Sequence, residues 1–308
     1  MTTPHSVTLL GCGDIGERLA AQLPANYTVV GLRRSPCQSS RIDYRQADSS
    51  DLDSLQQALP EHSEIIVITL TPSAYSDEGY RQAYVCAVDN LIRALDNKTP
   101  PRLILFVSST SVYGQSSGEW VDEHSATHPQ GYAGARLLEA EQRLQDSPYN
   151  TCVVRFSGIY GPGRHRLIQQ VRDGKGAPAV TGETPCDATA GEGDASGRPL
   201  FSNRIHVDDC AGVLAHLIQL PGTAPLYLAS DCEPSALGEV KQWLATQMGY
   251  GPSHLQPGPE ASSRASKRCR NQRLLDSGYR FRYPTYQEGY RQVLELLADK
   301  TSDSHRSA

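Results

Sequence analysis

The chain lacks long apolar runs, an excess of basic residues and closely spaced cysteines, and each absence excludes a class of protein. The longest apolar stretches, such as 65–70 and 103–107, have the length of a strand and fall well short of the ~20 residues that cross a membrane. Lysine and arginine number 29 against 34 acidic residues, so no basic field directs the chain to nucleic acid or an anionic membrane. The eight cysteines include no C-x-x-C pair and no cluster with histidine, which argues against a disulfide framework and a zinc site.

The N-terminus also lacks the marks of a secretion signal. Residues 1–6 carry no basic segment, and the apolar run 7–10 is too short for a signal peptide. The 308 residues suffice for one large or two small domains with a sizeable core, and they contain no internal repeat. We therefore expect a cytoplasmic protein that acts on a small-molecule substrate, with no nucleic-acid or membrane partner.

The first half of the chain alternates between strand-like and helix-like patterns. Apolar segments of strand length are followed by segments whose apolar residues recur at helical spacing. The predicted strands are 7–10, 28–32, 65–70, 103–107 and 152–156, and the predicted helices are 16–23, 52–59, 77–96 and 132–145. Such alternation builds right-handed βαβ units and a parallel sheet covered on both faces. We predict an α/β fold with a doubly wound parallel Rossmann sheet over residues 1–160.

The pattern changes after residue 160. Residues 173–199 are rich in glycine and proline and lack apolar periodicity, so we expect a mobile loop that orders when ligand binds. Beyond it we predict a helix that ends near 220, with Asp208 or Asp209 as its N-cap, and a second helix at 237–248. The predicted later parts are a smaller C-terminal α/β substrate domain at 161–300, partly interleaved with the first, and a disordered tail at 301–308.

A glycine-rich motif lies between the first predicted strand and the first predicted helix. Its residues are Gly11, Cys12, Gly13, Asp14, Ile15 and Gly16, which match the pattern G-x-G-x-x-G. Glycines let the backbone turn tightly and approach a pyrophosphate, while the helix N-terminus offers free N–H groups and positive potential. We predict that these six residues bind a dinucleotide.

The end of the second strand bears on which dinucleotide is bound. An acidic residue about 20 positions after the motif would bind the ribose 2′-hydroxyl of NAD, but Arg33 and Arg34 stand here instead. Two guanidinium groups can pair with a 2′-phosphate, so we predict NADP, with NAD as the alternative if the arginines are only a solvated strand end. Asp48 is expected near the adenine, or else as a residue that forms a turn.

The chain resembles an extended short-chain dehydrogenase/reductase of the NAD-dependent epimerase/dehydratase family. The matching segments occur in the family's order: 11–16, 108–114, 132–136, 155–162 and 204–209, with a weaker match at 268–290. The resemblance is greatest to an atypical bacterial subgroup that often lacks part of the active-site set. It implies hydride transfer at a carbinol carbon, and a homodimer formed through the helices at 77–96 and 132–145.

Three residues carry the catalytic roles that the resemblance implies. Ser109 matches the serine or threonine that hydrogen-bonds the reacting oxygen, and Tyr132 matches the acid–base tyrosine. Arg136 stands where the family has the lysine that holds the nicotinamide ribose and lowers the pKa of the tyrosine, which is near 10 when free. A guanidinium is longer, planar and unable to lose a proton, so we expect weakened catalysis.

Each of these residues also has a purely structural interpretation. Ser109 could form a turn, and Tyr132 could anchor the start of a helix. Arg136 could be a surface residue that pairs with Glu139 or Glu141.

Two further positions limit the substrate. In sugar-nucleotide 4,6-dehydratases the catalytic serine or threonine is followed by Asp and Glu, but Thr110 and Ser111 stand here, which disfavours that dehydration. Gly158 replaces an asparagine that contacts substrate in many relatives, so the assignment to sugar nucleotides is weakened.

Two clusters of charged residues remain. His206 with Asp208 and Asp209 is interpreted as a structural junction, and no metal site is predicted. A basic run could bind a substrate diphosphate or be a solvated linker; its residues are Arg264, Lys267, Arg268, Arg270 and Arg273. The leading hypothesis is an NAD(P)-dependent oxidoreductase or epimerase, with a nucleotide sugar as one candidate substrate. The alternative is an NADP-binding sensor or partner-binding protein with little or no catalysis.

Overall fold

The centre of the molecule is a seven-stranded parallel sheet in the order β11-β7-β5-β4-β1-β2-β3. The computed structural model describes residues 5–176, 200–256 and 266–306. The strands of the sheet are β1 (His5–Leu10), β2 (Tyr27–Arg33), β3 (Asp43–Gln46), β4 (Ile65–Ile68), β5 (Leu103–Ser109), β7 (Thr151–Phe156) and β11 (Leu226–Ala229). The chain reverses its direction across the sheet between β1 and β4, which is where doubly wound folds bind their ligands. The predicted Rossmann fold is confirmed.

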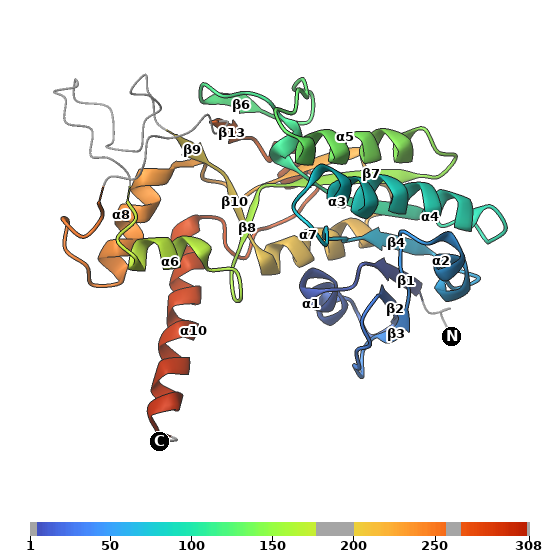
Figure 1. Ribbon diagram of the computed structural model, residues 1–308, viewed down its shortest axis with the longest axis horizontal. Helices are drawn as coiled ribbons and strands as arrows, with labels where there is room; N and C mark the ends of the chain where they lie inside the picture. The colour runs from blue at the N-terminus through green and yellow to red at the C-terminus, as the bar shows by residue number, and fades with distance from the viewer. Residues whose placement is uncertain (1–4, 177–199, 257–265, 307–308) are drawn as a thin grey trace.

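Helices cover both faces of the sheet, so its central strands are apolar on both sides. All four residues of β4 are buried, as expected for a strand inside a parallel sheet. The helices on one face are α1 (Asp14–Gln22) and α7 (Val207–Gln219), and those on the other are α2 (Leu52–Ala58), α4 (Ala87–Leu95) and α5 (Tyr132–Gln145). Alternate residues of β1 and β4 join one apolar core or the other. Figure 1 shows the two helical layers with the sheet between them.

The helix predicted at 77–96 is interrupted by a wider turn. It begins as α3 (Asp77–Tyr80), passes through a π-helical segment at Arg81–Cys86, and continues as α4. Such π-helical segments are rare and are found often at functional sites. This one packs against α5, the helix that begins at Tyr132.

A second core lies beside the carboxyl edge of the sheet, around α10 (Figure 1). Its helices are α6 (Arg166–Arg172), α8 (Leu237–Gln247) and α10 (Tyr286–Arg306); the short α9 spans Gln272–Asp276. Pairs of short strands connect this region to the sheet: β8 (Gly158–Tyr160) with β10 (Arg204–His206), β9 (Phe201–Ser202) with β12 (Ser235–Ala236), and β6 (Glu119–Val121) with β13 (Lys267–Cys269). The two parts interleave, because α7 and β11 follow residue 160 in sequence and yet complete the Rossmann layers.

Three expectations for the second half need correction. The N-cap of α7 is His206, whose Nδ1 accepts a hydrogen bond from the Asp208 N–H at 3.2 Å, because the helix begins at Val207, before both predicted caps. The basic run forms a strand at 267–269 instead of a linker throughout. The predicted disordered tail is wrong at its start, because α10 continues to Arg306. Residues 177–199 of the expected mobile loop, and Arg264, lie outside the described residues.

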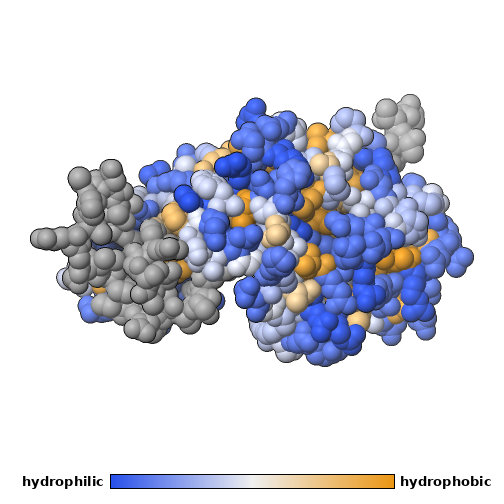
Figure 2. Space-filling model, turned by 90° about the horizontal axis from the view of Figure 1, so that it is seen from above, coloured by the Kyte–Doolittle hydropathy of each residue, from blue (hydrophilic) through white to orange (hydrophobic). Residues whose placement is uncertain are grey.

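The surface offers few large apolar side chains. Those exposed among the described residues are Tyr75, Trp120, Tyr132 and Leu296. The face in Figure 2 is largely hydrophilic, and hydrophobic residues appear only in small separate patches. Within the described ranges, no helix has the combined length and apolar character that a membrane crossing requires.

Candidate functional site

The glycine motif forms the turn between β1 and α1, and its three glycines meet three different requirements. Gly11 has a φ of +85°, and a Cβ there would lie 2.9 Å from the Leu70 Cα, so only glycine fits without strain. A Cβ on Gly13 would have no atom within 4 Å, so the backbone is open to an approaching ligand. A Cβ on Gly16 would lie 3.0 Å from the Cys12 Sγ, so glycine lets α1 pack closely. These are the roles that a dinucleotide-binding turn requires.

The first turn of α1 presents unpaired N–H groups toward this opening. Its N-cap is Gly13, which has no side chain to accept a hydrogen bond. The first N–H bonded back into the helix is that of Glu17, which donates to the Gly13 carbonyl at 2.9 Å. Across the described residues, the N–H groups of Asp14, Ile15 and Gly16 have no hydrogen-bond acceptor. Free N–H groups and the helix dipole together suit a phosphate group.

Residues 11–13 of the turn and the two arginines line one cleft of about 270 Å³. Arg33 is the last residue of β2 and Arg34 follows it, where the carboxyl end of that strand opens into the cleft. Arg33 Nη1 lies 3.6 Å from Glu17 Oε1, and its guanidinium lies over the Tyr44 ring at 5.7 Å. Arg34 has no hydrogen bond or ion pair to another described residue. The structure therefore brings the glycine turn and both predicted phosphate-binding arginines to one cleft.

Asp48 forms a turn close to the same cleft. Its Oδ1 accepts hydrogen bonds from the Ser50 N–H at 2.9 Å and the Ser50 hydroxyl at 2.7 Å, and these bonds lower the pKa of Asp48. The residues on either side, Ala47 and Ser49, line the cleft. The turn-forming role is thus present, while contact with an adenine stays a prediction.

Cys12 and Tyr44 support the turn from beneath. Cys12 is buried, and its Sγ lies 3.8 Å from the Tyr44 hydroxyl, which donates to Glu17 Oε1 at 3.1 Å. Burial raises the pKa of the Cys12 thiol to about 11, so it stays protonated and unreactive at neutral pH. Cys12 therefore contributes packing and its backbone rather than chemistry.

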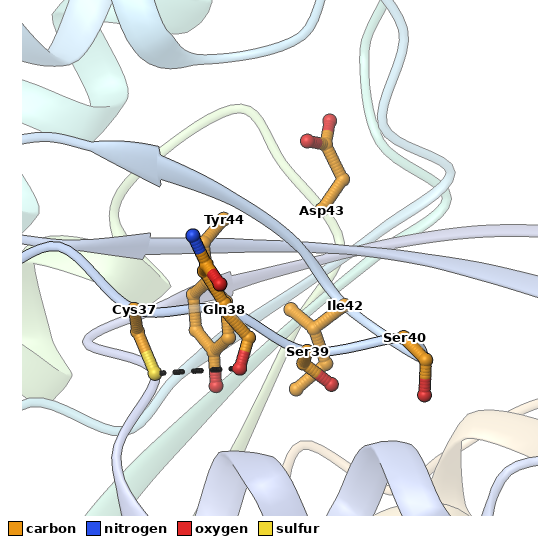
Figure 3. A pocket seen from close by; sticks show the side chains of 7 residues that line it. All are labelled: Cys37, Gln38, Ser39, Ser40, Ile42, Asp43 and Tyr44. Atoms are coloured by element: carbon orange, nitrogen blue, oxygen red, sulfur yellow. Dashed lines mark hydrogen bonds between the residues drawn. The ribbon is translucent and has the colours of Figure 1, made fainter.

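A second hollow, of about 690 Å³, lies on the loop between β2 and β3. Figure 3 shows its lining: Cys37, Gln38, Ser39, Ser40, Ile42, Asp43 and Tyr44. The hollow is open, and a single charged side chain, Asp43, lines it. It lacks the converging charges and free N–H groups of the glycine-turn cleft, which is the better candidate.

Ser109 ends β5 at the carboxyl edge of the sheet, close to the start of α5. Its half-buried side chain accepts a hydrogen bond from the Ser111 N–H at 3.1 Å, which caps a short turn at 110–112. Gly134 lets α5 approach that turn, because a Cβ there would lie 2.3 Å from the Ser111 carbonyl oxygen. The motif around Tyr132 is thereby held against the segment that carries Ser109.

Tyr132 is the first residue of α5, and the residue is 43% exposed. Its hydroxyl donates to the backbone carbonyl of Tyr75 at 2.8 Å, and its ring packs edge-on against Tyr80 at 5.5 Å. The hydroxyl makes no hydrogen bond to Ser109 or Arg136. To act on a substrate, Tyr132 has to exchange the Tyr75 carbonyl for the reacting oxygen.

Arg136 donates to carboxylates from each of its three nitrogen atoms. Its Nε and Nη2 donate to the two oxygens of Asp77 at 2.7 and 2.9 Å, and its Nη1 donates to Glu139 at 2.8 Å. The Arg136 guanidinium lowers the pKa of Asp77, so the pair stays ionised at neutral pH. Of the two partners that the sequence suggested, Glu139 is correct and Glu141 is wrong.

Glu141 lies instead in a buried ion pair behind β5 and β7. Its carboxylate accepts from Arg155 Nη2 at 2.6 Å and from the Ser108 hydroxyl, and all three side chains are buried. Arg155 also donates to the Tyr113 hydroxyl at 3.0 Å, which in turn donates to the Asp122 carbonyl. Sequence reasoning missed this network, which underlies the segment that carries Ser109.

The basic run serves several purposes. Lys267 is buried and donates to the Tyr113 carbonyl at 3.2 Å, while Arg273 donates to the Leu226 carbonyl at 3.0 Å. The guanidiniums of Arg268 and Arg270 lie 5.0 and 5.4 Å from the centre of the exposed Trp120 ring. Among the residues that the structure describes, no group of three or more His, Cys, Asp or Glu is arranged to hold a metal ion.

The strand order, the three-glycine turn and the cleft beside it define a dinucleotide-binding protein of the Rossmann class. The model of the NAD-dependent epimerase/dehydratase family matches residues 7–225, and the chain belongs to this family. It is 30% identical over 246 residues to Protein YeeZ of Escherichia coli K12, covering 74% of this chain and 78% of the relative.

Solved structures of related proteins have the same fold over nearly the whole of this chain. A Methylobacillus flagellatus protein assigned to the NAD-dependent epimerases/dehydratases is 33% identical, with a TM-score of 0.74 over 96% of this chain and 100% of the other. Human epimerase family protein SDR39U1, solved with NADPH, has a TM-score of 0.73 at 18% identity, over 94% and 99% of the two chains, and so supports the fold alone.

Proposed function

We propose that the protein binds NADP(H) in the glycine-turn cleft and uses it as an oxidoreductase or epimerase. The observation that carries the proposal is the shared cleft, which is lined by Gly11, Cys12 and Gly13 of the turn together with Arg33 and Arg34. The first turn of α1, which follows directly, adds three free N–H groups. No carboxylate occupies the end of β2, where an NAD-specific site would need one. The charges at that end favour the 2′-phosphate that distinguishes NADP from NAD.

The chemistry proposed for the site is proton transfer at a carbinol or carbonyl oxygen. NADP(H), when bound, would supply or accept the hydride. Ser109 would hydrogen-bond the reacting oxygen, and the exposed Tyr132 hydroxyl would deliver or remove its proton. Arg136 would contribute positive charge near Tyr132, but Asp77 and Glu139 already occupy all of its nitrogen atoms. We therefore expect slow turnover.

A nucleotide sugar is one substrate class that the surface supports. Trp120 offers an exposed aromatic ring, and Arg268 and Arg270 lie beside it without a carboxylate partner among the described residues. An aromatic face and two guanidiniums could hold a base and a diphosphate. This segment joins the site through Lys267, which contacts the carbonyl of Tyr113, four residues after Ser109.

Consumption of NADPH tests the oxidoreductase form of the proposal, and chromatography of the sugar products tests the epimerase form, because an epimerase returns the hydride and consumes no NADPH. The purified chain would be mixed with NADPH and a panel of sugar nucleotides and simple carbonyls, and absorbance would be followed. We expect slow oxidation with at least one member, no oxidation by Tyr132→Phe, and unchanged NADPH affinity in that variant. Equal rates in the wild type and Tyr132→Phe would refute the catalytic role of Tyr132.

A second function, an NADP-binding sensor with little catalysis, is favoured by one observation. The bidentate pair of Arg136 with Asp77 removes the cation from the place where the resemblance requires it. Tight NADPH binding with neither NADPH oxidation nor any epimerised product across the panel would support the sensor over the enzyme.

We also propose a homodimer, which the family resemblance implies through the helices at 77–96 and 132–145. These helices carry exposed ion pairs, such as Arg143 with Asp89 at 3.0 Å, so the proposed contact would be polar in part. Light scattering at micromolar concentration should give twice the monomer mass. A monomer at every concentration tested would contradict the assembly.

A further inference from the structure

One arginine from the second half of the chain reaches the phosphate-binding turn. Arg164, in the loop between β8 and α6, places its Nε 3.2 Å from Asp14 Oδ2. Asp14 is the first residue of α1 and belongs to the glycine motif. Figure 1 shows the loop between β8 and α6 extending toward α1. The contact therefore joins two segments 150 residues apart at the proposed cofactor site.

Asp14 creates an electrostatic problem at this position. A carboxylate stabilises a helix N-terminus, but it repels the pyrophosphate that the same N-terminus would bind. Two arginines offset its charge: Arg18 Nε lies 2.7 Å from Asp14 Oδ1, and Arg164 approaches the other oxygen. Asp14 therefore serves as an anchor that holds cations beside the turn.

Arg18 and Arg164 differ in how many of their guanidinium nitrogens are left to bind a ligand. Arg18 also donates through Nη1 to Asp208, so it is fixed between α1 and α7. Arg164 uses only Nε, and its Nη1 and Nη2 donate to no other described residue. Its side chain is 39% exposed. Arg164 thus retains both terminal nitrogen atoms as donors in a planar fork, the arrangement that suits phosphate oxygens.

The backbone presents Arg164 from a tight turn. Gly161, Pro162, Gly163 and Arg164 form it, and the Arg164 N–H donates to the Gly161 carbonyl at 2.8 Å. Gly163 has a φ of +81°, which together with proline before it fits a type II turn. Because β8 pairs with β10 just before the turn, the position of the backbone that carries Arg164 is fixed.

We propose that Arg164 is a pyrophosphate-binding residue, supplied to the glycine turn by the substrate half of the chain. Its free Nη groups would donate to the phosphate oxygens, while Asp14 holds the guanidinium in place. Since the pyrophosphate would then contact both halves, cofactor binding would strengthen the contact of the loop at 161–165 with α1. The inference rests on the proposed NADP(H) site.

Binding of two different ligands distinguishes the role of Arg164 in pyrophosphate binding from the proposed NADP(H)-dependent function itself. NADPH carries a pyrophosphate, whereas 2′-AMP carries the adenosine and 2′-phosphate but no pyrophosphate. Calorimetry would measure the affinity for NADPH. The affinity for 2′-AMP would be measured by its displacement of bound, fluorescent NADPH. The variants are Arg164→Gln, Arg164→Lys and a matched control, Arg166→Gln, which changes an exposed arginine two residues away with no partner among the described residues.

We expect Arg164→Gln to weaken NADPH binding about 10- to 100-fold, the usual range for a charge-assisted hydrogen bond. By the same reasoning, the affinity for 2′-AMP should change less than about twofold. Arg164→Lys should lose less affinity for NADPH than Arg164→Gln, and Arg166→Gln should bind NADPH as the wild type does. Unchanged NADPH affinity in Arg164→Gln, or equal losses for both ligands, would overturn the inference. A wild type that binds neither NADPH nor NADH would instead refute the proposed function, and this inference with it.

Discussion

Arg136 holds Asp77 through two parallel hydrogen bonds, from Nε to Oδ1 at 2.7 Å and from Nη2 to Oδ2 at 2.9 Å. Asp77 begins α3, two residues after the Tyr75 carbonyl that accepts the Tyr132 hydroxyl. The same segment thus binds the cation and the hydroxyl of the Tyr132–Arg136 motif. The pairing explains how Arg136 can be well placed as a structural residue and poorly placed to assist Tyr132.

Arg136→Lys should raise turnover if the site is a weakened enzyme. An ammonium cannot form the bidentate pair with Asp77, and it can contact a ribose or a phenolate compactly. We expect NADPH oxidation to increase about 10-fold or more, within the range of acid–base effects. The control is Arg143→Lys, on the same helix and also paired with Glu139, which should leave the rate unchanged. An unchanged rate in Arg136→Lys would favour the sensor.

Tyr132→Phe should abolish turnover without weakening NADPH binding. The change removes the proton that Tyr132 would transfer, and it also removes the hydrogen bond to the Tyr75 carbonyl. Tyr75→Phe is the control, since Tyr75 is 81% exposed and its backbone carbonyl remains. Initial rates and calorimetry report the two effects separately. Activity that survives in Tyr132→Phe would assign the proton transfer to another group.

Glu141→Gln should destabilise the fold. It leaves Arg155 buried without its counter-charge, and loss of one partner of a buried ion pair typically costs about 3–5 kcal/mol. Glu139→Gln is the matched control, because Glu139 also pairs with arginine, in its case with Arg136 and Arg143, but lies at the surface, where such pairs contribute little. Urea unfolding measures both free energies. A small, equal cost in the two variants would contradict the structural role given to Glu141.

Asp231→Asn should flatten the dependence of stability on pH. Burial raises the pKa of Asp231 to about 8, against about 3.9 in an unfolded chain. Between these values the folded state holds a proton that the unfolded state has lost, so stability falls as pH rises from about 4 to about 8. We expect wild type to lose up to about 1.4 kcal/mol per pH unit in that window, and Asp231→Asn to lose less. An identical slope in both proteins would refute this ionisation.

Local patterns predicted the elements that local forces determine. The predicted helix at 132–145 has the bounds of α5, because one apolar face recurs at helical spacing along its whole length. The pair of Arg136 with Glu139 also follows from spacing, since residues three apart share a helix face. Glu141 is five residues away and points elsewhere, which the same rule could have revealed.

Contacts between distant segments could not be predicted in this way. Asp77 lies 59 residues before Arg136 in the sequence, and Arg164 lies 150 residues after Asp14. Strands β6 and β13 have three residues each and pair across more than 140 positions, so neither is long enough to show a period. Such contacts depend on the sheet order, which single-segment patterns do not encode.

The most direct test of the central claim is a titration of NADPH and NADH into the wild type and Arg33→Ala/Arg34→Ala. The account predicts that NADPH binds at least about 10-fold more tightly than NADH, because two guanidiniums face the 2′-phosphate, and that the double variant loses this preference while still binding NADH. Tighter binding of NADH by the wild type, with no effect of the arginine substitutions, would contradict it.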